Sequence, residues 1–498
     1  MSRKEGKKNM RTRVDSRFLI ATIDGELQII DRGVLVYEGD TVVFVGPDYT
    51  EPCDRTIDAS NRIVSPGFIS AHTHMGGGPF DRSLREDVYD YWKTGLYEVL
   101  MPIRAATDAD ATRTATRATM LELMKSGVTS AIDLGASFEI TAQCAQESGL
   151  RTFIGQYIRT WNWATDGIGV TFEAVGDVEE QRLLDEAVSL VRRFNGTHSK
   201  IEAILAPAQV DTCSPDLLRE IARLSKELNV TVQTHAAQSP SEFDVILKRH
   251  GRTPIEYLDD LGLMNERLII GHGLFLTGHS WLRYPYGDDL GIIAESGATV
   301  AHCPTVFERH GQALENLYEY KKRGARVALG LDSAPHSMLA EMRTAGAIGR
   351  VLGRSEVAVT GRDLFHEATV ATADALGRSD IGRLSVGAKA DFVLFRTDTV
   401  SMTPLRDPIR NIVHHASPAD IDSVYIGGEA TIANGRPTYA DEAEIAAKLQ
   451  EAAYGVWKKF PKAHQAGKSV EDISPMSAPS IVAQCRAKDQ EILSANEN

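Results

Sequence analysis

Six polar residues stand at the ends of five apolar, strand-like segments of this chain. FISAHTH ends with His72 and His74, VTVQTHA contains His235, RLIIGHG contains His272, ATVAHCP contains His302, and RVALGLDS contains Asp332. Side chains two apart in a strand leave the same face, so His72 and His74 are expected to point to one side. Imidazoles together with a carboxylate are ligands that suit a zinc- or iron-type ion with an open coordination position.

A single histidine at the end of a buried strand more often has a structural role than a catalytic one. Here five histidines and one aspartate occupy equivalent places in successive segments, which chance explains poorly. The strands that carry them must therefore end at one common place.

A parallel barrel supplies such a place. From residue 66 to residue 378 apolar strand-like runs alternate with amphipathic helical stretches. This alternation predicts an α/β fold with a (β/α)8 TIM-like barrel. In such a barrel the carboxyl ends of the strands lie around one opening, and the active site is found there. Short β segments lie on both sides of this region, which predicts one small β-sandwich domain built from both chain ends.

The expected domains follow from these boundaries. Residues 1–65 and 379–440 are expected to form the two parts of the β-sandwich domain, residues 66–378 the barrel, and residues 441–498 a helical C-terminal extension. In the extension one helix face carries apolar side chains, namely Ile445, Leu449, Ala452, Val456 and Trp457. That face is expected to pack on the body of the protein or on a partner subunit, and we expect a homo-oligomer, a dimer or larger.

Composition limits the classes of function. With 498 residues, 43% of them hydrophobic, the chain can bury a large core, and its net charge of −14 argues against nucleic acid and anionic membranes as partners. Five scattered cysteines without a CxxC pair indicate free thiols in a reducing compartment. The basic start precedes no apolar leader, and no run is long enough for a membrane span. We therefore expect a cytoplasmic enzyme with a small-molecule substrate.

These motifs together resemble those of the amidohydrolase superfamily, more closely its cytosine-deaminase-like branch with the s-triazine hydrolases. The likeness extends over residues 17–440. It includes SPGFISAHTHM (65–75), SPDLL, THAAQSPSE, GHG, AHCP and GLDSAP in family order, and the closing β-domain motif IGRLSVGAKADFVLF (381–395).

The resemblance implies roles for individual residues. His72, His74, His235 and Asp332 would be the ligands of one divalent metal ion, Zn or Fe. His272 would contact the metal-bound water or the substrate carbonyl, and His302 stands where the family has a polar residue near the pocket. Binuclear relatives have a bridging Lys at the end of the fourth barrel strand, where this chain reads IEAILAPAQVD. Lys200 precedes that strand, so one metal ion is expected.

Two departures bear on the reaction. Deaminases of this branch have a Glu three residues after the fifth-strand histidine, where it protonates a ring nitrogen; this chain has Gln238, which forms hydrogen bonds but transfers no proton. Purine-type deaminases have a His after the Pro of the fourth strand, and here Ala208 and Gln209 follow it. Glu242 lies nearby, and its place after Ser239 has two explanations, the start of a helix, which we favour, and a catalytic role.

The loops after the early strands suggest where the substrate binds. Residues 76–95 contain Phe80 and Trp92, and residues 158–167 contain Trp161. Aromatic side chains at a barrel mouth suit a flat or apolar substrate, so these three and Gln209 are the candidate substrate-binding residues. Packing of a lid or of a subunit interface explains the aromatic residues equally well.

Three functional hypotheses remain. The first is a mononuclear metal-dependent amidohydrolase that acts on an amide, urea or carbamate with an aryl or apolar part, with His272, Asp332, Gln238 and His302 as its catalytic residues. The second is a hydrolytic deaminase or dechlorinase of a substituted heteroaromatic ring of the s-triazine type. The third is a non-catalytic metal-binding barrel, which the presence of every expected ligand disfavours. Gln238 is the residue that distinguishes the first two.

Overall fold

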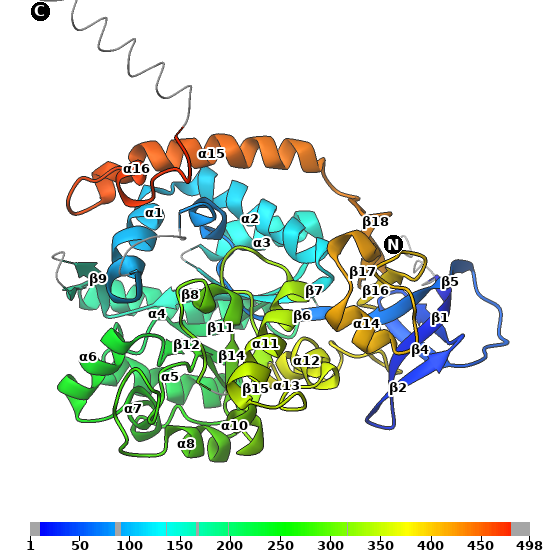
Figure 1. Ribbon diagram of the computed structural model, residues 1–498, viewed down its shortest axis with the longest axis horizontal. Coiled ribbons are helices and arrows are strands. Elements are labelled where there is room, and N and C mark those ends of the chain that lie inside the picture. Colours follow the sequence, from blue (N-terminus) through cyan, green and yellow to red (C-terminus); the bar gives the residue numbers. More distant parts are fainter. Residues whose placement is uncertain are drawn as a thin grey trace, which may run out of the picture.

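The computed structural model describes residues 10–84, 91–135, 137–165, 169–197, 199–315 and 317–479, and of residues 91–95 only the backbone. Its centre is a sheet of eight parallel strands that follow one another in chain order (Figure 1). These strands are β6 (Phe68–Thr73), β7 (Val128–Gly135), β8 (Arg151–Ile158), β11 (Ile201–Pro207), β12 (Val232–Ala236), β13 (Leu268–His272), β14 (Thr299–His302) and β15 (Arg326–Leu329).

The two ends of this sheet meet. The backbone N–H groups of Leu331 and Asp332, just after β15, donate to the carbonyl of His72 on β6 at 2.9 and 2.8 Å. Thr73 and Asp332 also form a parallel bridge. The strands are buried along nearly their whole length because helices cover the outside, which explains their apolar sequences. The predicted (β/α)8 barrel is confirmed.

Helices surround the barrel between successive strands (Figure 1). They include α2 (Ala109–Lys125), α3 (Phe138–Ser148), α4 (Asp177–Phe194), α5 (Pro215–Leu228), α6 (Pro240–His250), α7 (Pro254–Asp260), α8 (Asp289–Ser296), α9 (Pro304–Glu308), α10 (Leu317–Lys322), α11 (Met338–Gly353), α12 (Gly361–Glu367) and α13 (Val370–Ala375). The starts of α5 and α6 show why they form there. Ser214 and Ser239 cap them by accepting the backbone N–H three residues on, and a proline follows each serine.

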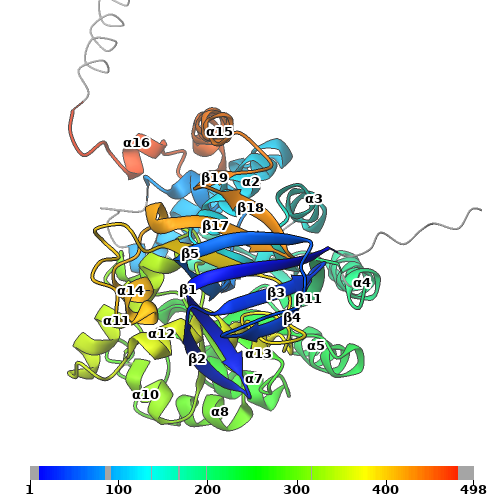
Figure 2. The ribbon, with the colours of Figure 1, turned by 90° about the vertical axis from the view of Figure 1, so that its right-hand side faces the viewer.

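A second sheet joins the two ends of the chain. Its strand order is β19 (Arg436–Pro437), β18 (Glu429–Ala433), β17 (Ile421–Ile426), β16 (Phe392–Arg396), β5 (Arg55–Pro66), β1 (Arg11–Ile23), β3 (Val34–Glu38) and β4 (Thr41–Gly46), with β2 (Glu26–Asp31) also paired to β1. Figure 1 shows this sheet beside the barrel, and Figure 2 shows its strands from the side on which they lie in front of the barrel.

The join lies between β5 and β16, which pair antiparallel from Phe392 opposite Pro66 to Arg396 opposite Arg62. Only the β1–β5 pair in this sheet is parallel among the described strands. The small β domain predicted from both chain ends is therefore present, and its strands form one continuous hydrogen-bonded sheet. The residue limits assigned to the four domains stay predictions.

The C-terminal helix α15 (Glu442–Ala463) lies across α1 (Met101–Ala106) and α2, as Figure 1 shows in orange above the barrel. Ile445 and Val456 are buried, so the predicted apolar face does turn toward the body of the protein. Trp457 Nε1 donates to the Phe80 carbonyl at 2.9 Å, which fixes α15 to the loop that follows β6. The rest of the predicted extension, residues 480–498, lies outside the described residues.

Smaller elements complete the chain. They are the hairpin of β9 (Trp161–Thr165) and β10 (Val170–Ala174), α14 (Pro408–His414), α16 (Val470–Ile473), the short 3-10 helices η1 (Gly78–Asp81) and η3 (Pro418–Asp420), and the π-helical segment η2 (Tyr91–Leu100). Among the described residues, no helix combines the length and apolar character needed to cross a bilayer.

Candidate metal centre and active site

Four buried histidines and one aspartate converge at the carboxyl ends of the barrel strands. His74 Nε2 lies 3.2 Å from His235 Nε2 and 3.5 Å from Asp332 Oδ1. His272 Nε2 lies 3.8 Å from Asp332 Oδ2, and the ring of His72 stands edge-on to the other three at 4.7–4.8 Å between centroids. Strands far apart in the sequence thus bring the predicted residues to one point.

Hydrogen bonds on the outer nitrogens fix how two of these rings face the centre. His74 Nδ1 lies 2.8 Å from the Leu134 carbonyl, and His235 Nδ1 lies 2.6 Å from the Ala208 carbonyl. A carbonyl only accepts, so each Nδ1 carries the proton and each Nε2 presents a lone pair. Two lone pairs that face each other at 3.2 Å repel unless a cation lies between them.

His72 gives a second, independent sign of a bound cation. Both of its ring nitrogens are buried, and neither has a hydrogen-bond partner within the described parts of the chain. Donor atoms of His72, His74 and Asp332 lie within 4.8 Å of one another, as do those of His72, His235 and His272. An unsatisfied buried imidazole is costly without a partner, and a divalent metal ion provides one. The histidines and Asp332 are therefore suited to bind a divalent metal ion, and this cluster is a divalent metal site.

The surroundings keep the imidazoles in the neutral, metal-binding form. Burial lowers the pKa of His72, and it lowers the pKa values of His74, His235 and His272 well below the ordinary value, to which neighbouring imidazoles add. Burial alone lowers the pKa of His302 to about 4. None of these rings needs to lose a proton before it binds a metal near neutral pH.

The backbone is strained at the same place. Asp332 and Ala237 have φ values of 47° and 53°, and His272 has a φ of 107°, a conformation that side chains with a Cβ rarely adopt. Such residues persist only where the surrounding structure holds them, and they concentrate at functional sites. Here the hydrogen bonds of β6 to Asp332 hold the strained turn that presents the carboxylate.

A small chamber of about 60 Å³ opens onto these residues. Its described walls include His74, His235, Asp332, Gln238 and Gln209, and Asp332 is the only carboxylate among them. Gln209 Oε1 and Gln238 Oε1 are buried and have no hydrogen-bond partner in the described regions. Both amide oxygens therefore lack a hydrogen-bond partner among the described groups that surround them.

Two larger cavities adjoin the chamber. An inner one of about 190 Å³ lies between Gly76–Gly78 and Tyr157, and an outer one of about 500 Å³ lies along the β9–β10 hairpin. Trp161 and Gln209, two of the residues predicted to bind substrate, line the outer cavity.

The other two aromatic predictions have different outcomes. Phe80 is fully buried in an apolar cluster with Ile103 and Val456, so the structure places it beneath the loop and not on a described cavity wall. Helix α15 covers it, which the local sequence does not reveal. The side chain of Trp92 lies outside the described residues.

Three further sequence predictions can be placed. His302 is buried at the end of β14, close enough to His272 to lower the pKa of that ring, but it lines none of the three cavities described above. Glu242 lies in the first turn of α6, as expected, and its carboxylate accepts the backbone N–H groups of Ala237 and Gln238, before the helix, at 2.6 and 3.1 Å. Lys200 Nζ donates to the Ile426 carbonyl at 2.9 Å and thus turns away from the barrel mouth.

Sequence reasoning missed two residues of the site. The Tyr157 hydroxyl lies 3.2 Å from His74 Nδ1, and its position near the end of β8 is the same strand-end signal that identified the histidines. Arg104 lines the chamber and both adjoining cavities. It lies on α1, so a search for polar residues at the ends of strands does not find it.

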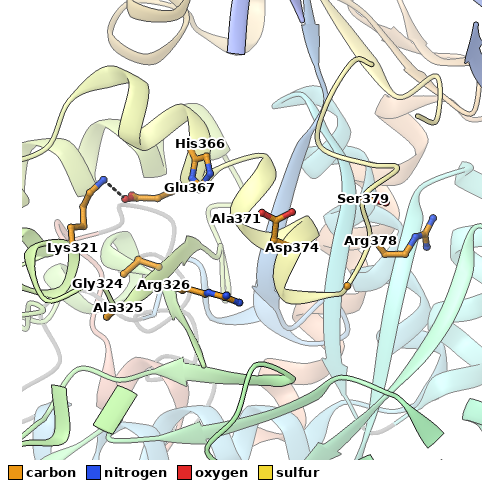
Figure 3. Close-up of a pocket in the computed structure, with 12 residues that line it drawn as sticks. Lys321, Gly324, Ala325, Arg326, His366, Glu367, Ala371, Asp374, Arg378 and Ser379 are labelled. Atoms are coloured by element: carbon orange, nitrogen blue, oxygen red, sulfur yellow. Dashed lines mark hydrogen bonds and ion pairs between the residues drawn. The ribbon is translucent and has the colours of Figure 1, made fainter. Parts of the chain in front are cut away.

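A cavity of about 690 Å³ lies elsewhere, near the start of β15 (Figure 3). Most of its charged groups have partners: Lys321 pairs with Glu367 at 3.0 Å, and Arg378 pairs with Asp380 at 2.7 Å. Its lining residues include Arg326, the first residue of β15, which places it at the amino ends of the strands, away from the metal site. Chemistry in barrel enzymes occurs at the opposite face.

Known proteins share this architecture over most of its length. A model of the Amidohydrolase family matches residues 63–431. A 5-methylthioadenosine/S-adenosylhomocysteine deaminase of Pyrococcus abyssi is 29% identical over 429 residues, 85% of this chain and 95% of the relative. A 5'-deoxyadenosine deaminase of Methanopyrus kandleri is 28% identical over 440 residues, 86% of this chain and 96% of the relative.

Two solved structures show the same fold. An adenosine deaminase from Xanthomonas campestris with bound zinc superposes with a TM-score of 0.78 at 20% identity, covering 89% of this chain and 98% of that one. Atrazine chlorohydrolase from Arthrobacter aurescens TC1, complexed with zinc, superposes with a TM-score of 0.76 at 22% identity, covering 89% and 100%.

Proposed function

This chain belongs to the amidohydrolase family, and from that premise we propose that it hydrolyses the C–N bond of an amide, urea or carbamate with an aryl or apolar part. The observation that carries this proposal is which side chains line the chamber: one carboxylate and, at the position of the family's Glu, a glutamine. Asp332 is the only carboxylate on its described walls, and Gln238, whose buried amide oxygen has no partner in the described chain, lines the same chamber. One carboxylate must then both take and return the proton.

An amide or urea suits a single proton carrier. Its carbon is attacked without prior protonation of a ring nitrogen, so no second acid is needed before the attack. Asp332 takes a proton from the attacking water and passes it to the leaving nitrogen. His272, 3.8 Å from Asp332 Oδ2, and the amide of Gln238 orient the substrate. His302, which acts electrostatically on His272, supports that ring in this proposal and does not contact the substrate.

The proposed metal ligands are His72, His74, His235 and Asp332, which would hold one ion, zinc or iron. A divalent ion there lowers the pKa of water enough to make a nucleophile available near neutral pH. The described end of β11 carries no lysine that could bridge a second ion, which supports a single one. A cytoplasmic location and assembly as a homo-oligomer remain predictions.

We expect removal of the metal to abolish turnover and to lower the melting temperature. Chelation should reduce kcat/KM at least about a hundredfold, since the ion supplies several kcal/mol of transition-state stabilisation. One equivalent of zinc or ferrous iron should restore it, as measured by activity and by elemental analysis. His235→Asn should lose the ion, whereas His250→Asn, a change at an exposed histidine on α6, should keep it. Restoration that requires two equivalents would contradict the single-ion proposal.

A second candidate is hydrolytic deamination or dechlorination of a heteroaromatic ring. It is favoured by the names of the similar proteins, which are nucleoside deaminases and an atrazine chlorohydrolase. The test of both candidates is a panel of aryl amides, ureas, carbamates, aminotriazines and chlorotriazines with metal-loaded protein. Ammonia or amine release and a mass gain of one water identify the reaction. Turnover confined to triazines or nucleosides would overturn the first candidate.

Gln238 provides a sharper test. Gln238→Glu should not raise kcat/KM for a urea, because the amide orients the substrate and transfers no proton. We expect a decrease of about tenfold to a hundredfold, the effect of losing one oriented hydrogen bond and adding a like charge beside Asp332. The measurement is kcat/KM on one urea and one aminotriazine. A gain on the urea would show that the proton path was assigned wrongly.

A further inference from the structure

Arg104 occupies a position shared by all three connected cavities. It lines the metal chamber, the inner cavity and the outer cavity, and its side chain is half-buried. Across the described chain its guanidinium has neither an ion pair nor a hydrogen bond. Arg151 and Arg378, by contrast, pair with the carboxylates of Asp391 and Asp380. Within the described chain, no carboxylate therefore neutralises the charge of Arg104.

The outer cavity adds a second positive charge. Arg104 and Arg159 are the only charged side chains on its described walls, and no Asp or Glu lines it. Arg159 Nε is buried and has no hydrogen-bond partner in the described structure. Trp161 and Trp163 form an aromatic wall beside these arginines. A concentrated positive charge in a chain of net charge −14 calls for an anionic ligand.

The charge of the metal chamber supports the same conclusion. Its described walls carry one negative group, Asp332, and one cation, Arg104. A divalent ion at the histidine cluster would leave the chamber with an excess of positive charge. The inner cavity differs, because Asp81 lines it and disfavours an anion there. The anionic group is thus expected on the side of the outer cavity.

We propose that Arg104 binds an anionic group of the substrate, a carboxylate held between the outer cavity and the metal chamber, so that the enzyme acts on aryl amides or ureas that carry an acid function. Its planar fork of N–H donors matches a carboxylate in two parallel hydrogen bonds. The aromatic wall takes the flat part, and the C–N bond lies toward Asp332. This inference rests on the proposed function and specifies its substrate.

The first test measures binding and does not depend on turnover. Zinc-loaded protein is titrated with 2-naphthoate and with 2-acetylnaphthalene, a neutral ligand of similar shape, by calorimetry. We expect 2-naphthoate to bind about tenfold to a hundredfold more tightly. Arg104→Met should abolish this preference, and Arg104→Lys should restore part of it. Because the metal is present in every sample, coordination of the carboxylate to the ion cannot account for a loss in Arg104→Met.

Arg326→Met is the matched control. Arg326 lines the cavity of Figure 3, so this change removes the same charge without altering the mouth of the barrel. It should leave the preference intact. Arg104→Met should also keep the melting temperature, since Arg104 pairs with no buried carboxylate. Equal binding of both ligands to the wild type, or a preference that survives Arg104→Met, would overturn the inference.

Measurements of turnover distinguish a failure of this inference from a failure of the proposed function on which it rests. Matched ureas with and without a carboxylate should differ in kcat/KM by about tenfold to a hundredfold, mainly through KM, and Arg104→Met should remove the difference. Hydrolysis of neutral and acidic ureas at equal rates would refute the role of Arg104 and leave the proposed function intact. Tight carboxylate binding without any hydrolysis would refute the proposed function alone.

Discussion

Replacement of Asp332 with Asn is expected to reduce kcat/KM by about a hundredfold to ten-thousandfold, the usual contribution of a positioned proton carrier. Asparagine keeps the size of the side chain and one oxygen that can face the ion. It cannot take a proton from water or return it to the leaving nitrogen. Because no other carboxylate lines the described chamber, no neighbouring group takes over this role.

Two measurements separate the proton path from the metal. Zinc content by elemental analysis shows whether Asp332→Asn still holds the ion, and kcat/KM is then compared at equal occupancy. Asp374→Asn is the control, since Asp374 lies on α13 at the cavity of Figure 3 and pairs with Arg383. It should leave kcat/KM unchanged. Fully zinc-loaded Asp332→Asn with activity within about tenfold of the wild type would remove Asp332 from the proton path, because a lost carrier costs at least about a hundredfold.

The site histidines could be predicted because residues at the carboxyl ends of the strands of a parallel barrel all lie around the same opening. Each of His72, His235 and His272 follows or ends an apolar run, and parallel strands bring such ends to one mouth. The union of both chain ends in one sheet was predictable for a similar reason. Short β segments before and after the barrel each lack a core, and pairing β5 with β16 gives them one.

Residues outside the strands could not be placed in this way. Phe80 was predicted at the pocket, but α15, which begins more than 350 residues later in the chain, covers its loop and buries it. Arg104 lies on α1 and lines the metal chamber, because α1 packs between α15 and the opening of the barrel. A local pattern holds no information about such distant contacts. Glu242 was predictable because its partners, Ala237 and Gln238, lie within five residues.

One ion pair fastens the barrel to the small domain. Arg151, the first residue of β8, donates from Nε and one terminal nitrogen to Asp391 at 2.9 and 3.2 Å, just before β16. Both side chains are at most 4% exposed. Asp391 also accepts the backbone N–H of Gly427 at 2.6 Å. Burial alone would lower the pKa of Arg151, but the charge and hydrogen bonds of Asp391 reverse this and raise that pKa.

Asp391→Asn is therefore expected to lower the free energy of unfolding by about 3–5 kcal/mol, because it leaves the guanidinium buried without a counter-charge. The double variant Arg151→Met/Asp391→Leu should recover most of this loss, since an apolar pair removes both desolvation penalties. Denaturant unfolding of the zinc-loaded proteins measures both effects. Lys248→Met, which breaks an exposed pair with Asp244 on α6, should change stability by at most about 0.5 kcal/mol. A comparably small effect of Asp391→Asn would mean that solvent reaches Arg151 and that the two parts of the protein are joined by apolar packing alone.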